Sequence, residues 1–337
     1  MSVTARLVIG IDVGGTKALA GLVDENLEII ATTTRPTHGA DAERLLDILA
    51  EQVAELQALA EGEIVGIGLG IPALLDKEGR AAQTVNLPLP GGAPIGAVLA
   101  DRVGLVVASD NDANCAVIAE HRAGAAKGLD HVVLLTVGTG VGGGVIVGGR
   151  ALRGAHGLGA ELGHIVIRAD GRPCIGSCPN HGCLEAEASG SALVREATEL
   201  AEANPGSELG RALAAGKLDG PKVTALAEAG DELGLAALTT IARSLGVGMS
   251  SLANIFDPDV ILVGGGVSAA GELLVGPART EFASRAMPPI VRRTEVRLAQ
   301  FGSEAGLLGA AILAFDAVDG SPDVGPVARP GAAVPPA

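Results

Sequence analysis

Short apolar runs separated by turns dominate the first part of the chain. Residues 7–13 form a Val- and Ile-rich run, and residues 18–24 and 27–34 continue in the same way, with the turn DEN between them. The segment 41–61 instead places four leucines and Val53 on one helical face, with acidic residues opposite. The pattern therefore predicts three strands followed by an amphipathic helix.

Strands and helices alternate along the rest of the chain. The same patterns predict further strands at 64–75, 103–112 and 295–301, a strand with a glycine loop and a helix from 259, and helices at 112–124, 231–256 and 304–317. Such alternation is typical of α/β proteins. Residues 319–337 carry five prolines and three glycines, so we expect a disordered tail there.

The segment HVVLLTVGTGVGGGVIVGG, residues 131–149, repeats the opening arrangement of strand, glycine-rich loop and strand. Its seven glycines break the apolar run in the middle, which favours a hairpin over a membrane span. This repeat predicts two related lobes with a cleft between them.

Composition narrows the function. Hydrophobic residues make up 48% of the chain and aromatic residues only 1%, so Ala, Val, Leu and Ile must build the core. The net charge of −15 argues against nucleic acid or an anionic membrane as the main partner. The N-terminus shows no secretory signal pattern, and we expect a cytoplasmic protein.

The opening stretch LVIGIDVGGTKALAGLVD, residues 7–24, contains the first candidate site. A dinucleotide loop requires G-x-G-x-x-G at the start of a helix, but a strand-like run follows GGTK, and the P-loop spacing is absent. A hairpin remains, either an ordinary turn capped by Asp12 or a loop whose amides approach a phosphate. In the second case Asp12 would hold Mg²⁺, through a water molecule.

Two further glycine loops, at 136–144 and 264–268, favour the phosphate interpretation. Hairpins in both lobes could hold the phosphates from two sides, and the third loop could take the nucleoside. The predicted ATP-binding residues are Asp12, Gly14, Gly15, Thr16, Lys17, Gly138, Thr139, Gly140, Gly264, Gly265 and Gly266.

Five segments of the chain resemble the ROK family of sugar kinases and regulators: DVGGTK, SDNDANCA (109–116), GAHGLGAELGHIVI (154–167), CPNHGCLEA (178–186) and DPDVILVGGGVS (257–268). The match is collinear from about residue 6 to residue 317. The resemblance implies a bilobal, ribonuclease-H-like or actin-like ATPase fold with duplicated lobes and an interlobe cleft. It also implies ATP-dependent phosphorylation of a hexose, most often glucose, and a homodimer.

On this basis we expect a small lobe at 1–111, joined by the C-terminal helix 303–317, and a large lobe at 112–302. The large lobe would carry a zinc loop at 164–183, and residues 318–337 would form the disordered tail.

The resemblance makes Asp112 the catalytic base, which accepts the proton of the sugar hydroxyl, and makes both Asn111 and Asp112 sugar ligands. An Asp before a helix is more often an N-cap, and Asp110 is assigned to that role here. Carboxylates and imidazoles suit vicinal hydroxyls, and the family assigns this task to Glu161, His164 and Glu185. Asn86 matches a sugar-binding asparagine of the family, although Leu89 stands where the family has Gly.

A Cys₃His set suits tetrahedral Zn²⁺ in a closed structural site: His164, Cys174, Cys178 and Cys183. The spacing C-x₃-C-x₄-C departs from the C-x-C-x₄-C of the family between the first two cysteines, and His181 could compete as a ligand. Zinc on one ring nitrogen of His164 would orient the other toward the sugar. Cys115 is expected to be a buried apolar residue.

Alternatives remain within and beyond this class. The acceptor could be N-acetylglucosamine, N-acetylmannosamine, fructose or allose, and the donor could be polyphosphate. A non-catalytic sugar sensor is the alternative of another class. A nicotinamide dehydrogenase would rest on glycine loops alone, and the missing helix after GGTK argues against it.

Overall fold

The computed structural model describes residues 5–84, 87, 89–176 and 178–332. The chain divides into two compact units. The first unit combines Met1–Arg122, Arg150–Ala160 and Glu304–Ala337, and the second combines Ala123–Gly149 and Glu161–Ser303. The segments 112–122 and 150–160, which we had assigned to the large lobe, thus group with the N-terminal part.

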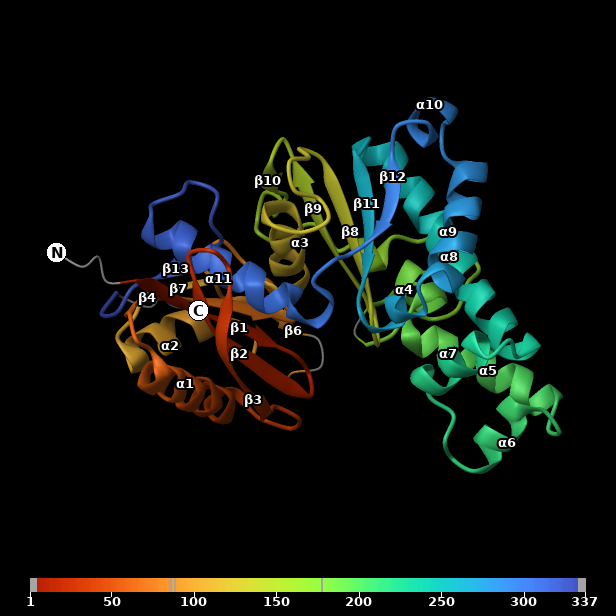
Figure 1. Ribbon diagram of the computed structural model, residues 1–337, viewed down its shortest axis with the longest axis horizontal. Helices are drawn as coiled ribbons and strands as arrows, with labels where there is room; N and C mark the ends of the chain where they lie inside the picture. Colours follow the sequence, from red (N-terminus) through yellow and green to blue (C-terminus); the bar gives the residue numbers. More distant parts are fainter. Residues whose placement is uncertain (1–4, 85–86, 88, 177, 333–337) are drawn as a thin grey trace. The chain divides into compact units, whose positions relative to one another are not determined.

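A mixed sheet forms the centre of the first unit (Figure 1). Its order is β13-β7-β4-β1-β2-β3, built from β1 (Arg6–Val13), β2 (Lys17–Asp24), β3 (Ile29–Pro36), β4 (Glu63–Ile71), β7 (Val107–Asn111) and β13 (Val327–Ala328). Strands β1 and β2 form an antiparallel hairpin, whereas β4 runs parallel to both β1 and β7. The carboxyl ends of β1, β4 and β7 therefore meet at one edge of the sheet.

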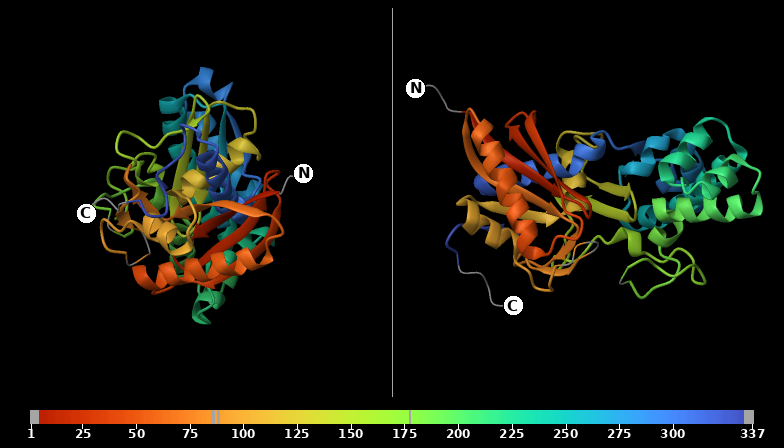
Figure 2. Two further views of the ribbon diagram at one scale, coloured as in Figure 1. Left: turned by 90° about the vertical axis from the view of Figure 1, so that its left-hand side faces the viewer. Right: turned by 90° about the horizontal axis from the view of Figure 1, so that it is seen from below.

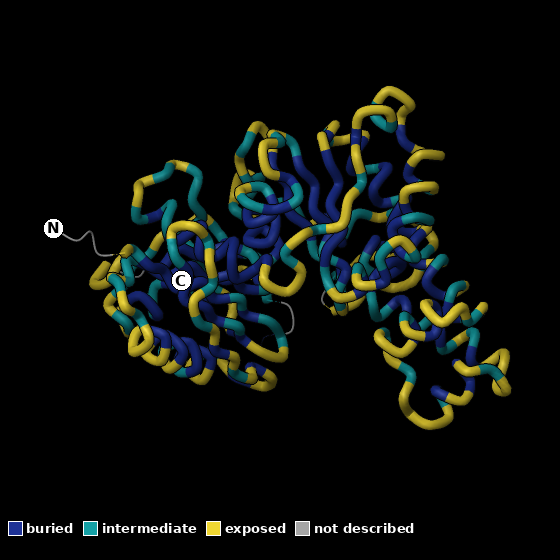
Figure 3. The backbone as a smooth tube through the Cα atoms, viewed as in Figure 1, coloured by how far each residue is buried: buried dark blue, intermediate teal, exposed yellow. Residues whose placement is uncertain are grey.

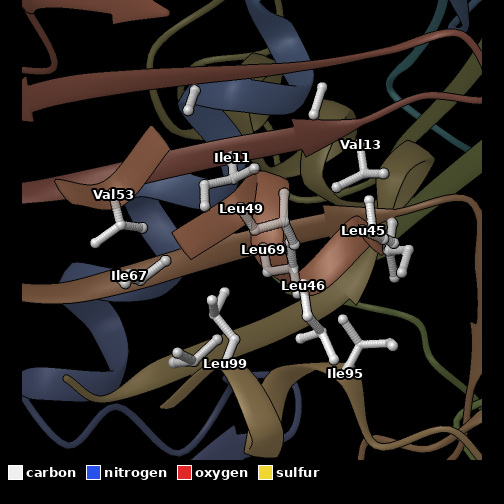
Figure 4. Packing of buried hydrophobic residues seen from close by; sticks show 14 of the residues in the cluster. Ile11, Val13, Leu45, Leu46, Leu49, Val53, Ile67, Leu69, Ile95 and Leu99 are labelled. Carbon is white, nitrogen blue, oxygen red and sulfur yellow. The ribbon is translucent and has the colours of Figure 1, made fainter. Parts of the chain in front are cut away.

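Helices α1 (Ala42–Leu59) and α2 (Ile95–Val103) cover one face of this sheet (Figure 2, right). Asp41 caps α1 by accepting a hydrogen bond from the backbone N–H of Arg44 at 2.9 Å. The apolar stripe of α1, which includes Leu45 and Leu49, packs on Ile11 and Leu69 of the sheet (Figure 4). The predicted amphipathic helix is thus the core-facing helix of the first unit.

Glycines bring helix α11 (Ala305–Val318) close to the opposite face. A Cβ atom at Gly68 of β4 would lie 1.7 Å from the backbone O of Ala310, and one at Gly10 of β1 would lie 2.3 Å from the backbone O of Leu307. Only glycine permits this approach. Helix α3 (Asp112–Arg122) packs beside α11 and follows β7 directly.

The segment after α11 is described to residue 332, although we expected disorder over 318–337. Val327 and Ala328 pair antiparallel with Ala108 and Val107 of β7, which makes β13 an edge strand of the sheet. Residues 333–337 lie outside the described part of the chain.

The second unit also contains a mixed sheet, in which β9-β8-β11-β12 are neighbours. Its strands are β8 (Val132–Val137), β9 (Val141–Val147), β11 (Val260–Gly264) and β12 (Glu295–Leu298), and β10 (Arg150–Ala151) follows β9 in the chain. Helices α4 (Leu184–Ala188), α5 (Gly190–Ala203), α6 (Glu208–Ala214), α7 (Gly220–Glu228), α8 (Glu232–Phe256), α9 (Glu272–Arg285) and α10 (Pro288–Val291) complete it.

Helix α8 is the core helix of this unit. Among the described residues it is the one helix long and apolar enough to cross a membrane, but 61% of its apolar window is buried inside the protein. Figure 3 shows buried positions concentrated in the sheets and on the inner faces of their helices.

Two element boundaries differ from the sequence predictions. The predicted strand 103–112 contains the end of α2 and then β7, because the chain turns at Gly104, which has a φ of 71°. The predicted strand 64–75 consists of β4 and a separate strand β5 (Ala73–Leu75), which pairs with β6 (Ala81–Thr84).

Candidate active site and metal centre

The first glycine loop is the tight turn of the β1–β2 hairpin. The backbone N–H of Gly14 donates to the backbone O of Lys17 at 2.8 Å, and the Thr37 hydroxyl donates to the backbone O of Gly14 at 2.7 Å. Thr16 and Lys17 are exposed. A strand follows GGTK, as predicted, so the turn presents a hydroxyl and an ammonium group rather than a helix N-terminus.

Asp12 is the next-to-last residue of β1, just before this turn, and it is half-buried. Burial and the negative charge of Asp112 raise the pKa of Asp12 to about 7, while Lys17 opposes the shift. A Cβ atom at Gly306 would lie 2.5 Å from Cγ of Asp12, so α11 begins directly against this carboxyl group. Carboxylate oxygens that repel one another are suitable donors for Mg²⁺, which would remove that repulsion.

Asp112 is the first residue of α3, at the carboxyl end of β7. The Asn111 side-chain oxygen accepts hydrogen bonds from the backbone N–H groups of Ala113 and Asn114 at 2.9 and 3.3 Å, so Asn111 caps the helix. Burial raises the pKa of Asp112. The arrangement places a basic carboxylate at a strand-to-helix junction.

Asp110 does not cap this helix, contrary to our assignment. Its Oδ1 accepts from the backbone N–H of Asn111 and from Nδ2 of Asn114, both at 2.8 Å. Its Oδ2 accepts from Nε of Arg153 at 2.7 Å. Asp110 therefore anchors the turn that carries Asp112. Sequence reasoning missed Arg153, whose only signal is a charged residue just before the GAHG segment.

Asn86, the remaining sugar ligand predicted for the N-terminal part, lies outside the described residues.

The second glycine loop is the turn of the β8–β9 hairpin, and it is tied to the start of α5. The backbone N–H of Gly190 donates to the backbone O of Gly138 at 2.8 Å, and the Ser191 hydroxyl donates to the backbone O of Thr139 at 2.8 Å. The third loop packs against the same hairpin: a Cβ atom at Gly265 would lie 2.6 Å from the backbone N of Val137. The second and third glycine loops are thus adjacent within the second unit.

Glu185, in α4, contacts this second loop directly. Its Oε2 accepts a hydrogen bond from the backbone N–H of Val141 at 3.0 Å. A Cβ atom at Gly140 would lie 2.1 Å from the same oxygen. A predicted sugar ligand and a predicted phosphate loop are therefore in contact, which the sequence spacing did not indicate.

Four side chains gather in the cysteine-rich loop. One ligand atom from each of His164, Cys174, Cys178 and Cys183 lies within 4.8 Å of all the others. Among the described residues, the exposed His181 is not part of this group.

The donor distances in this cluster fit zinc. The Cys178 and Cys183 sulfur atoms are 3.8 Å apart, and Sγ of Cys174 lies 3.5 Å from Nδ1 of His164. Tetrahedral Zn²⁺ with ordinary bond lengths separates two sulfur atoms by about 3.8 Å and a sulfur from an imidazole nitrogen by about 3.5 Å. Burial and the neighbouring thiols raise the pKa of Cys174, and a bound cation would favour its thiolate form.

The imidazole of His164 links the cysteine cluster to the predicted sugar ligands. Its Nδ1 faces Cys174, whereas its Nε2 lies 3.9 Å from Oε2 of Glu161. Sγ of Cys174 is also 3.9 Å from Oε1 of Glu185. A metal on Nδ1 would leave Nε2 directed toward Glu161 and would fix the ring.

Comparisons with known proteins identify the family. The ROK family matches residues 8–317. Glucokinase of Thermotoga maritima is 37% identical over 93% of this chain and 98% of that protein. N-acetyl-D-glucosamine kinase of Escherichia coli O1:K1 / APEC is 30% identical over 90% of this chain and 98% of that protein.

One of the similar solved structures is that of a ROK family glucokinase from Streptomyces griseus in complex with glucose and AMPPNP. It has a TM-score of 0.82 and 37% identity, and the alignment covers 92% of this chain and 99% of that one. The α/β architecture is thus that of the ROK sugar kinases, which share the actin-like ATPase fold.

Proposed function

Because this chain belongs to the ROK family, we propose that it is an ATP-dependent glucokinase, which transfers the γ-phosphoryl group of ATP to the 6-hydroxyl of glucose. The proposal rests on the position of the Asp112 carboxylate. Its Oδ1 accepts a hydrogen bond from the backbone N–H of Ala113, and its negative charge helps to raise the pKa of Asp12. The relatives at 37% identity that are named glucokinases support the choice of sugar.

Asp112 is the general base of this proposal. Phosphoryl transfer to an alcohol needs an acceptor for the hydroxyl proton, and positioning with charge neutralisation supplies most of the remaining rate enhancement. The raised pKa of Asp112 makes it a stronger base than an exposed carboxylate. Asn111, whose Oδ1 is used in the helix cap, would offer its Nδ2 group to the sugar.

The three glycine loops would bind the nucleotide. Gly14–Lys17 and Gly138–Gly140 offer backbone N–H groups, the Thr16 hydroxyl and the Lys17 ammonium group to phosphate oxygens. Asp12 would hold Mg²⁺ through water, and this ion neutralises charge on the phosphates when it is bound. Gly264–Gly266 would take the nucleoside.

The Cys₃His cluster would hold a structural Zn²⁺ that orders the loop carrying His164. The chain's own residues then bind the sugar: the carboxylates of Glu161 and Glu185 accept hydrogen bonds from its hydroxyls, and the imidazole of His164 forms another. The hydrogen bond between Glu185 and the second glycine loop supports its place among the substrate-binding residues.

A coupled ADP-release assay tests the function. The purified protein is offered glucose, mannose, fructose, allose, N-acetylglucosamine and N-acetylmannosamine with ATP or polyphosphate. The highest kcat/KM should be found with glucose and ATP. Binding of glucose without ADP release would instead identify a sugar sensor.

The second candidate is an N-acetylhexosamine kinase, which the relative at 30% identity favours. A higher kcat/KM for N-acetylglucosamine than for glucose in the same panel would establish it.

We also propose that the protein is a cytoplasmic homodimer, as its resemblance to the family implies. Light scattering after size exclusion should give about twice the chain mass of 33.3 kDa.

A further inference from the structure

The segment after α11, residues 319–332, lies against β7, the strand that ends just before the proposed catalytic base. Besides the β13–β7 pairing, the backbone N–H of Ser109 donates to the backbone O of Pro326 at 2.9 Å. Gly325 lies so close to β7 that a Cβ atom there would be 2.2 Å from the backbone O of Ser109. This segment follows the residues matched by the ROK family, which end at 317. We call residues 319–332 the C-terminal strap.

The strap also reaches the turn before α3 through charged side chains. Oδ1 of Asp323 accepts a hydrogen bond from Nη1 of Arg153 at 3.2 Å, and Nε of the same guanidinium donates to Asp110 at 2.7 Å. Asp110 is 3% exposed and in turn accepts from the backbone N–H of Asn111. A continuous series of hydrogen bonds thus runs from the strap to the residue before Asp112.

Packing alone does not hold Arg153. Its side chain lines a cavity of about 400 Å³, together with Lys77, Gly157 and Val324. Its Nη2 is buried without a hydrogen-bond partner among the described residues. The two carboxylates are therefore the contacts that orient the guanidinium, and they act from opposite ends because the group is planar and rigid.

We propose that the C-terminal strap positions Asp112 for catalysis: Asp323 orients Arg153, which orients Asp110 and thereby the β7–α3 turn. Asp323, Arg153 and Asp110 are positioning residues in this scheme, and none of them is assigned contact with substrate. The proposal rests on the proposed role of Asp112. A small displacement of a general base lowers kcat because proton transfer depends steeply on the distance between the reacting atoms.

The test uses Asp323→Asn in the full-length protein. The change removes the charge but keeps the shape, and it should lower kcat about three- to tenfold while KM for ATP stays the same. Asp323→Glu retains a carboxylate and should recover most of the activity. Asp319→Asn is the matched control, because Asp319 is also in the strap and pairs with an arginine, Arg6, but at an exposed position. It should leave kcat unchanged.

A second variant, Arg153→Lys, tests the series of contacts. A lysine keeps the charge but lacks the separate Nε and Nη1 groups that donate to Asp110 and Asp323, so kcat should fall at least as far as in Asp323→Asn. Adding Asp323→Asn to Arg153→Lys should lower kcat no further, because both changes break the same series. Additive losses would overturn the proposal, as would an Asp323→Asn variant that unfolds more easily yet has the wild-type kcat.

Hydrogen–deuterium exchange separates this proposal from the proposed function. If no sugar in the panel is phosphorylated, the glucokinase assignment fails, and exchange alone decides the role of the strap. Asp323→Asn should then speed amide exchange over residues 107–114, whereas Asp319→Asn should not. Unchanged exchange there would overturn the strap proposal.

Discussion

Oε2 of Glu185 accepts a hydrogen bond from the backbone N–H of Val141 at 3.0 Å. A residue expected to bind sugar is thereby fixed by the loop expected to bind phosphate. The contact is possible because Gly140, next to Val141, has no side chain. The role of this glycine is steric, since its φ is not positive and any residue could adopt its backbone conformation.

Gly140→Ala should therefore impair sugar binding more than folding. The new methyl group would lie 2.1 Å from Oε2 of Glu185, and the flexible carboxylate would move away at little cost in stability. We expect KM for glucose to rise about tenfold, the loss of one good hydrogen bond. Gly138→Ala is the matched comparison, because its methyl group meets no atom within 4 Å. Equal KM values for glucose in the two variants would contradict the argument.

Zinc content tests the cysteine cluster. The purified protein should contain about one equivalent of zinc, and Cys178→Ser should lose most of it because one of the four donors is gone. Elemental analysis measures this directly. Cys115→Ala is the control, since Cys115 is buried in the first unit and is not a member of the cluster. Less than half an equivalent in the unaltered protein would rule out a structural zinc site.

Loss of the zinc should also lower thermal stability and raise KM for glucose, because His164 would lose its fixed orientation. Melting curves and kinetics before and after chelation measure both effects. Unchanged KM in zinc-free protein would mean that the metal has no part in sugar binding.

Replacement of the proposed base should abolish turnover without unfolding the protein. We expect Asp112→Ala to lower kcat about 100- to 10,000-fold, the usual contribution of general base catalysis. Zinc content and glucose binding by calorimetry should remain. Near-normal kcat in this variant would assign proton removal to another group.

Asp12 should make the Mg²⁺-free protein less stable at high pH. The pKa of Asp12 is about 7 in the folded protein and about 3.9 in the unfolded chain. Between these values the folded state binds more protons, so the free energy of unfolding falls as the pH rises from about 4 to 7. The loss attributable to Asp12 is of the order of 2–4 kcal/mol.

Urea unfolding of the wild-type protein and Asp12→Asn at pH 5 and pH 8 measures this difference. The two proteins should be similar at pH 5, where the Asp12 carboxyl is protonated, and Asp12→Asn should be the more stable at pH 8. Parallel pH dependence of both proteins would show that Asp12 is ionised at pH 5 as well.

Local patterns determined most of the secondary structure. The short apolar runs of residues 7–24 predict the β1–β2 hairpin, and the leucine periodicity of 41–61 predicts α1, because both patterns reflect which residues are buried. Helix α2 begins in a segment for which we predicted no element and ends in the predicted strand 103–112, because its nine residues are too few for a clear helical period before the chain turns at Gly104.

The cysteine cluster was also predictable, because three of its four ligands lie close together in the chain and the chemistry of thiolates is specific. The contacts of Glu185 with Val141 and of Arg153 with Asp110 were not, because they join residues more than 40 positions apart. Contacts between residues so far apart in the chain leave no periodic pattern in the sequence.

The structure of the C-terminal strap likewise could not be predicted from local sequence patterns. The prolines and glycines of 319–337 indicate disorder when they are read alone, since the segment offers few apolar side chains to bury. In the folded protein, backbone pairing with the open edge of β7 and the Asp323–Arg153 ion pair hold it. The sequence by itself determined most of the elements, the glycine loops and the four residues of the cysteine cluster. Only the tertiary structure decided which distant side chains orient the turn of Asp112, because that depends on where the edge strand and its charged neighbours meet.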